Sequence, residues 1–253
     1  MTTIDRVSFV HALDIGVVHP KLAKVSLANE VAPTGPTAAV DAGSLMSFTA
    51  NVSAQHRGDA LNSTLLAQLN SDKLYNRFDP AQLIAWYRNY TTVLSNIGWD
   101  MQEFEFEKYQ AAGSTMSVST AVLGVLGAVL PAGELALVAA ALKALAALKS
   151  DDPWYRVWDV TTHDQSNGNF QVSNCADQDG ATNTLVMRMS GYSLRTSETT
   201  VRFLWNDYQA SSTDLVYASQ TTTLDEDVYG QVRQAVIKKL GAKAVQYVGN
   251  LDI

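Results

Sequence analysis

Residues 109–149 read YQAAGSTMSVSTAVLGVLGAVLPAGELALVAAALKALAALK, and almost no charge interrupts them. No charged residue precedes Glu134 in this stretch, and Lys143 is the only other charge before Lys149. The segment Pro131–Gly133 breaks the apolar run near its middle. Because proline and glycine interrupt helices, the pattern predicts two apolar helices joined by a short turn, which we call the apolar hairpin.

The two arms of the apolar hairpin are expected over about 115–130 and 134–149, each about 24 Å long at a rise of roughly 1.5 Å per residue. Small residues such as Gly124, Gly127 and Ala140 allow a helix to approach its neighbours closely. A helix that is apolar on every side is usually buried. One interpretation therefore makes the hairpin a permanent core element.

A second interpretation is that the apolar hairpin enters a membrane. Glu134 lies at its turn, and protonation would neutralise this charge, so Glu134 is the candidate pH gate. Each arm is slightly shorter than the roughly 20 residues that cross a bilayer. The candidate lipid-contacting residues are Leu123, Leu126, Leu130, Leu137 and Leu142.

The layout of this apolar run is similar in kind to the hydrophobic hairpins of colicin-type pore-forming domains and of the translocation domains of bacterial toxins. The resemblance covers the apolar run alone. It implies a toxin-like effector that stores an apolar hairpin until it meets lipid. The strand-rich second half of the chain departs from those all-helical domains.

The rest of the chain predicts an α+β fold, in which an antiparallel β-sheet packs with the buried apolar hairpin and with flanking amphipathic helices. No flexible linker is visible near residue 150, so we expect a single domain over 1–253. Its expected parts are mixed strand and loop over 1–58, two helices and a strand over 59–112, the apolar hairpin over 113–150, an antiparallel meander over 151–224, and a C-terminal helix over 225–253.

Capping residues place the amphipathic helices. Asp59 is a plausible N-cap for the first of them, and Asp79 followed by Pro80 for the second, which ends at Gly98. The acidic run that begins at Asp225 favours the start of a last helix through the helix dipole.

Alternating and β-branched residues place the strands. Short strands or irregular structure are expected over 7–29, a loop over 32–37 and a half-buried strand near 46–52. The Glu-Phe-Glu-Phe-Glu run within 99–109 predicts another strand. The meander is expected to contain strands at 154–163, 169–175, 183–194, 200–208 and 214–222, separated by turns at 166–168, 177–180, 196–198 and 210–212.

Composition excludes several classes of protein. The chain is 47% hydrophobic and 17% charged, which is typical of a globular protein, and its net charge is -7. An acidic surface repels phosphate backbones, so we expect no nucleic-acid partner. No basic segment followed by a long apolar run opens the sequence. We therefore expect a protein that is cytoplasmic as made, or exported without a classical signal peptide.

No catalytic or cofactor motif is visible. Cys175 is the only cysteine, and His163 is predicted to lie too far along the partner strand to activate it. Cys175 is best interpreted as a buried thiol, and it is also the candidate for covalent modification. The spacing of the histidines and of residues 177–180 fits no metal site, so we expect no cofactor and no metal.

The leading functional hypothesis is a non-enzymatic membrane- or lipid-interacting effector, with lipid as the partner. The alternative is a soluble binding or self-assembling protein, a homo-oligomer for example, that keeps the hairpin in its core and binds carbohydrate or protein. A hydrolase using Cys175 or a serine ranks third, because no Gly-x-Ser-x-Gly signature occurs.

Overall fold

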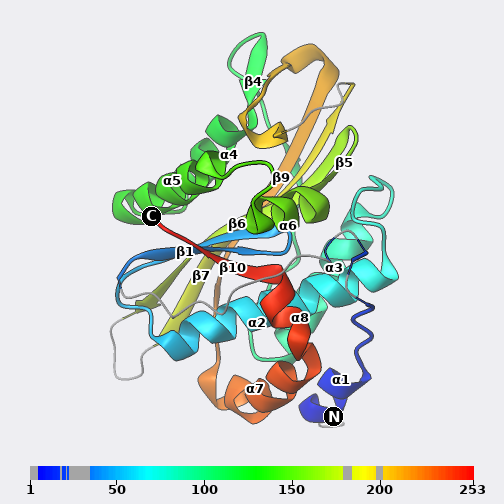
Figure 1. Cartoon of the computed structure of the whole chain (residues 1–253), viewed down its shortest axis with the longest axis vertical. Coiled ribbons are helices and arrows are strands. Elements are labelled where there is room, and N and C mark those ends of the chain that lie inside the picture. The colour runs from blue at the N-terminus through cyan, green and yellow to red at the C-terminus, as the bar shows by residue number, and fades with distance from the viewer. Residues whose placement is uncertain (1–4, 18, 21, 23–34, 179–183, 198–201) are drawn as a thin grey trace.

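The computed structural model describes residues 5–17, 19–20, 22, 35–178, 184–197 and 202–253, and they form an α+β fold in which helices cover both faces of a mixed sheet (Figure 1). The helices are α1 (Arg6–Ala12), α2 (Ala54–Leu74), α3 (Leu83–Asn96), α4 (Val118–Gly127), α5 (Ala132–Ala147), α6 (Pro153–Thr162), α7 (Glu226–Leu240) and α8 (Ala242–Tyr247), with short 3-10 turns at Phe203–Trp205 and Ala210–Ser212. The strands are β1 (Thr37–Asp41), β2 (Ser44–Phe48), β3 (Glu107–Lys108), β4 (Thr115–Ser117), β5 (His163–Asp164), β6 (Asn167–Gln178), β7 (Thr184–Thr196), β8 (Asp207–Gln209), β9 (Thr213–Thr223) and β10 (Val248–Leu251).

The main sheet is mixed rather than antiparallel. Its order is β10-β1-β2-β6-β7-β9-β3, and β5 pairs with the start of β6. The pair β2 and β6 is parallel, with Ser44 beside Gln171, while the other pairs of this sheet are antiparallel. The chain between these two strands carries α2 to α6, and a crossover of that kind allows two strands to run in the same direction. The expected antiparallel sheet is confirmed at the other pairs, including the meander β6-β7-β9, and the parallel pair β2 and β6 is the departure from it among the described strands.

Alternation along β6 divides the two faces of the sheet. Phe170 stacks on Tyr192 of β7 at a ring distance of 5.0 Å and lies near Trp158 of α6. Its neighbour Asn169 accepts a hydrogen bond from Tyr87 of α3 at 2.9 Å. One face therefore packs on α6 and the apolar hairpin, and the other on α2 and α3.

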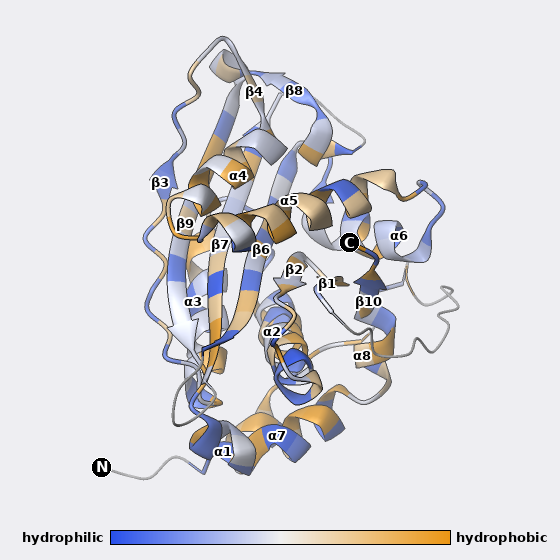
Figure 2. Ribbon diagram, turned by 90° about the vertical axis from the view of Figure 1, so that its left-hand side faces the viewer, coloured by the Kyte–Doolittle hydropathy of each residue, from blue (hydrophilic) through white to orange (hydrophobic). Residues whose placement is uncertain are grey.

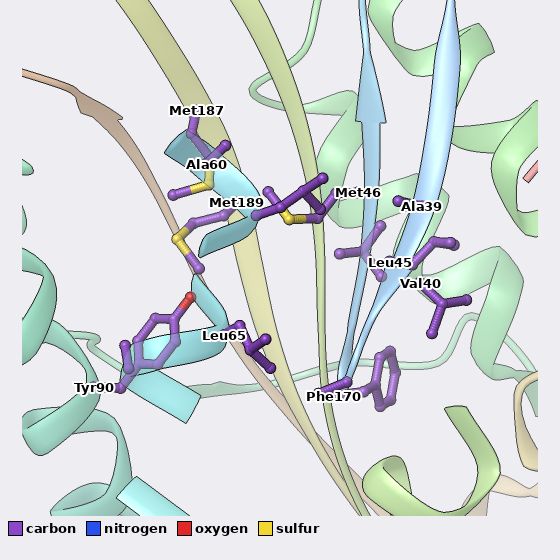
Figure 3. Close-up of a cluster of buried hydrophobic side chains, with 14 of the residues drawn as sticks. Ala39, Val40, Leu45, Met46, Ala60, Leu65, Tyr90, Phe170, Met187 and Met189 are labelled. Atoms are coloured by element: carbon purple, nitrogen blue, oxygen red, sulfur yellow. The ribbon is translucent and has the colours of Figure 1, made fainter. Parts of the chain in front are cut away.

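The buried core continues across the face that α2 and α3 cover. Figure 3 shows side chains of α2 (Ala60, Leu65) and α3 (Tyr90) beside Met187 and Met189 of β7. All five are buried, so this helical layer is joined to the sheet by continuous apolar packing.

The start of each helix in this layer differs from the expected one. Ser53 is the N-cap of α2, since its side chain accepts a hydrogen bond from the backbone of His56. Asp59 instead lies buried inside the helix. Asp79 accepts from the backbone of Ala81 in a turn that precedes α3.

Residues 154–163, expected as a strand, form α6. Asp152 caps this helix by accepting hydrogen bonds from the backbone of Trp154 and Tyr155, and Pro153 occupies its first turn. Aromatic and β-branched residues are common in strands, which is why the composition of this segment favours a strand although its cap starts a helix.

The expected strand over 99–109 is mostly extended chain without a ladder. Only β3 pairs with β9, although Phe104 and Phe106 do share one side and contact the ring of Tyr87 at 4.9 and 4.8 Å. The strand expected at 200–208 is replaced, in its described part, by the 3-10 turn Phe203–Trp205 and the short strand β8.

Several expectations lie partly outside the described residues. Within the segment expected as short strands, the structure has α1. Residues 18, 21, 23–34, 179–183 and 198–201, which include parts of three expected turns or loops, are outside the described part of the chain.

The C-terminal segment is more than the single helix expected over 225–253. Asp225 caps α7, as predicted, and Gly241 ends it with a φ of 50°. The chain then forms α8 and returns to the sheet as β10, which pairs with β1. Gly249 is required there, because a Cβ on it would lie 1.9 Å from the ring of Trp154.

Candidate functional site

The apolar hairpin is formed by α4 and α5, which lie side by side on one face of the sheet and carry mainly hydrophobic colours in Figure 2. Leu126, Leu130 and Leu142 are buried, whereas Leu123 and Leu137 are half-buried. Three of the five candidate lipid-contacting residues thus face the protein in this conformation.

The outer surface of the hairpin is almost uncharged. Its exposed positions are mainly glycine, alanine and proline, and Lys143 is the one exposed charge within α4 and α5. No large hydrophobic residue of α4 or α5 is fully exposed. The described part of the chain has no helix with the length and apolarity needed to cross a membrane. The hairpin therefore keeps its large apolar side chains inward.

Glu134, the candidate gate, is held by an ion pair. It lies in the first turn of α5, and its carboxylate accepts two hydrogen bonds from Nη1 of Arg188 on β7, at 2.8 and 3.1 Å. The side chains of Arg188 and Glu134 are 17% and 15% exposed. A charge-assisted contact shielded from water in this way is stronger than a surface pair.

A second arginine holds the other end of α5. Arg202 donates hydrogen bonds to the backbone carbonyls of Ala146 and Leu148, and its guanidinium lies 4.7 Å from the ring of Tyr155. Carbonyls at a helix C-terminus lack partners within the helix and carry negative partial charge. One arginine at each end therefore secures α5.

The sheet surface beneath the hairpin includes polar side chains. Asn174 donates to Ser47 at 2.9 Å, and both lie beneath the hairpin with Arg188. The amide oxygen of Asn174 has no hydrogen-bond partner among the described residues. A buried polar group without a partner weakens the docked state, because water would satisfy it.

The opposite helical layer is joined to the sheet by many more polar contacts. Tyr87 donates to Asn169, and Gln171 donates to Tyr87 while its amide oxygen accepts a hydrogen bond from Ser44. Gln68 of α2 donates to the carbonyl of Asp41 at 3.0 Å. This layer is therefore joined to the sheet by buried hydrogen bonds as well as by apolar packing.

A buried charged network completes that attachment. His56 of α2 faces Asp177 of β6 at 2.6 Å and Glu226 of α7 at 2.7 Å, one on each ring nitrogen. Arg233 then joins Glu226 to Asp59, at 2.7 and 2.8 Å. Three separate elements thus meet at one imidazole.

Asp41 of β1 is fully buried, and burial raises its pKa to about 8. Thr64 is its hydrogen-bond partner. A carboxyl with this pKa stays protonated when folded, while the unfolded chain releases the proton near pH 4.

We expect Asp41→Asn to remove a pH dependence of stability. Between about pH 4 and pH 8 the folded state binds more protons at Asp41 than the unfolded state, so stability falls as pH rises, by up to about 1.4 kcal/mol per pH unit. Urea denaturation at about pH 5 and pH 8 measures this fall. The variant should lose less stability than the wild type between these values. Parallel curves for the two proteins would contradict the assignment, and Asp214→Asn, at an exposed carboxylate, is the control.

Cys175 is completely buried on the side of the sheet that faces α2 and α3, and burial raises the pKa of its thiol. A buried neutral thiol is a poor nucleophile. His163 lies far from it, opposite Gly168 at the start of β6, beside Asp159 and the ring of Phe203. Among the described residues, no cluster of three metal-binding side chains occurs.

Comparisons with known proteins give distant similarities only. No protein-family model and no curated protein sequence matches the chain. Among solved structures, the activated Cyt2Ba monomer from Bacillus thuringiensis subsp. israelensis has 10% identity and a TM-score of 0.40, over 73% of this chain and 97% of that one. The Evf virulence factor has 8% identity and a TM-score of 0.40, over 83% and 85% of the two chains. A delta-endotoxin has 10% identity and a TM-score of 0.33, over 79% and 88%.

Proposed function

We propose that this protein is a non-enzymatic, toxin-like effector that acts on lipid, and that its α4–α5 hairpin leaves the sheet when it meets a membrane. The observation that carries the proposal is the way the hairpin is attached. Its large apolar side chains point inward, its outer surface is nearly uncharged, and arginines hold the two ends of α5.

Apolar burial keeps the hairpin docked in water. Each buried leucine contributes about 1.5–3 kcal/mol, so exposing Leu126, Leu142 and Leu145 to water would be strongly unfavourable. In hydrocarbon the same side chains are again shielded from water. A lipid surface therefore removes most of the free-energy cost of releasing the hairpin, whereas in water that cost remains.

The size of the hairpin favours insertion along the surface rather than across the bilayer. At roughly 1.5 Å per residue, α4 and α5 are about 15 and 24 Å long, shorter than a hydrocarbon layer of about 30 Å. We therefore expect the hairpin to enter one leaflet rather than to cross both. Lys143 would then remain at the level of the headgroups.

Glu134 is the gate in this proposal. Release separates it from Arg188, and an ionised carboxylate in lipid costs about 2.5–3.5 kcal/mol on insertion scales. Protonation removes this charge and the ion pair together. Lipid binding should therefore be stronger in acid.

Liposome flotation with dye release tests the gate, at about pH 7 and pH 5, on neutral and anionic vesicles. We expect Glu134→Gln, which removes the charge and the ion pair with Arg188, to bind vesicles at about pH 7 more strongly than the wild type does. Glu134→Lys should bind more weakly than Glu134→Gln, because a charge remains at the turn. Asp214→Asn, an acid-to-amide change at an exposed ion pair on β9, should behave as the wild type.

Two outcomes decide against the proposal. If no protein floats with vesicles under any condition, the hairpin is a permanent core element and the membrane function is rejected. If both Glu134 variants bind as the wild type does at each pH, lipid binding stands but Glu134 is not its gate.

A further inference from the structure

A cavity of about 190 Å³ lies away from the hairpin, where four parts of the fold meet. These are the end of α2 and the loop after it, the β1–β2 turn, the end of α6, and α8. None of the residues that line it belongs to α4 or α5. The proposed membrane function therefore makes no use of it.

A fixed pair of opposite charges lines the cavity. Nε and Nη2 of Arg77 each donate to a carboxylate oxygen of Asp72 at 2.7 Å. Nη1 donates to the carbonyl of Thr161 at 2.7 Å, and the guanidinium lies 4.8 Å from the ring of Trp86. The Trp86 indole also donates to Asp72, at 2.8 Å. These contacts hold the planes of both groups in one orientation.

The pair keeps hydrogen-bonding capacity for a ligand. The Arg77 side chain is only 4% exposed. Three of its five N–H groups donate to described residues, so two remain for a ligand. The Asp72 side chain is 35% exposed, so its carboxylate is open on one side. Donors and an acceptor thus lie side by side on the cavity wall.

Aromatic and amide groups form the remaining walls. Tyr75 and Phe78 are half-buried, and Tyr247 is buried, with its hydroxyl accepting a hydrogen bond from the backbone of His19. The amide oxygen of Asn76 accepts a hydrogen bond from the backbone N–H of Phe78, so the amino group of Asn76 remains for a ligand. A small number of fixed polar groups among apolar walls is typical of ligand sites.

We propose that this cavity binds one neutral pyranose ring. Asp72 and Arg77 neutralise each other, so this pair by itself selects neither an anion nor a cation. Each hydroxyl of a sugar both donates and accepts, so two neighbouring hydroxyls match a carboxylate beside a guanidinium. The apolar C–H face of the ring matches the aromatic walls. The volume admits a single ring.

The Trp86 indole N–H reports on this site directly, since it is bonded to Asp72. We would record NMR spectra of the full chain with isotope-labelled tryptophan while adding methyl glycosides of glucose, galactose and mannose. A saturable shift of the Trp86 signal is expected for at least one of them. Methyl glucuronide, which carries a charge, should bind at least about tenfold more weakly.

A matched pair of variants locates the binding. Val160→Phe fills the cavity wall and should weaken binding at least about tenfold, whereas Leu74→Phe, at an exposed position outside the cavity, should not change it. Asn76→Ala on the exposed rim tests the site without filling it, and it should also weaken binding. Equal affinity in Val160→Phe, Asn76→Ala and Leu74→Phe would overturn the assignment.

The sugar could be free or part of a lipid headgroup, and vesicles distinguish these sources. Vesicles of phosphatidylcholine with and without a galactosyl lipid are compared, because hairpin-dependent binding contributes equally to both. Binding only to the galactosyl vesicles supports a headgroup, and binding only to free glycosides supports a soluble sugar. Absence of a saturable Trp86 shift with both free glycosides and galactosyl vesicles overturns the proposal, whatever the hairpin does.

Discussion

We expect His56→Ala to lower the free energy of unfolding by about 3–5 kcal/mol, because removing one partner from a buried charged network leaves the others without compensation. Asp177, whose side chain is 1% exposed, would keep a hydrogen bond from the backbone of Ser53 and lose the imidazole. Glu226 would keep only Arg233. Since domains are stable by about 5–15 kcal/mol in total, urea denaturation should show a large fall in the midpoint.

The control for this prediction is His163→Ala. That imidazole is half-buried beside Asp159 and the ring of Phe203 and belongs to no buried charged network among the described residues, so its loss should cost clearly less than the loss of His56. Repeating His56→Ala in an Asp177→Asn background should cost less than in the wild type, because the stranded carboxylate is gone. Equal costs in both backgrounds would contradict the proposed coupling.

Arg188→Met is expected to speed hydrogen exchange of the α4 and α5 amides by about 10–100-fold, while α2 and α3 change little. The substitution leaves Glu134 half-buried without its cation, and a hydrogen bond to a charged group contributes about 1.5–3 kcal/mol. A difference of about 1.4 kcal/mol is tenfold in an equilibrium constant. Exchange followed by mass spectrometry, peptide by peptide, reads this local opening.

Lys108→Met is the matched control, since it breaks an ion pair whose partners are 59% and 60% exposed. It should leave exchange of the hairpin unchanged. If Arg188→Met raises exchange equally in α2 and α4, the hairpin does not open on its own. Release at a membrane would then require the whole sheet to open.

Local patterns were enough to predict some elements. The two helices of the hairpin were predicted because a long apolar run broken by Pro131 leaves few other structures, although residues 115–117 of the expected first arm form β4. The end of α3 at Gly98 and the start of α7 at Asp225 were found from single capping residues. Pro131, Gly98 and Asp225 each lie within one helical turn of the helix end that they mark.

Other features needed information that no local pattern contains. Arg188 and Arg202 come from a strand and a loop far along the chain, so their contacts with α5 depend on which strand lies beneath it. One signal was available, because a lone Glu134 in an apolar run requires a cationic partner. His56, Asp177 and Glu226 likewise come together only through the fold.

The error at α6 was avoidable from the residues. Tyr155, Trp158 and Thr162 recur at steps of three and four, and all are buried, as expected for one face of a helix. Asp152 and Pro153 also form a helix start. The aromatic and β-branched composition of this segment favours a strand, whereas the spacing of its buried residues matches the roughly 3.6-residue period of a helix.

The position of β1 in the sheet has a consequence for the order of assembly. β1 lies between β2, its neighbour in sequence, and β10, so Ala38 pairs with Ser47 on one side and with Leu251 on the other. Contacts between such distant segments raise the contact order, and proteins with high contact order fold slowly. On the ribosome, β1 would remain an unpaired edge until the C-terminal residues emerge, and such edges invite pairing with other chains. A nascent chain of this protein therefore depends on β10 to protect β1 from aggregation.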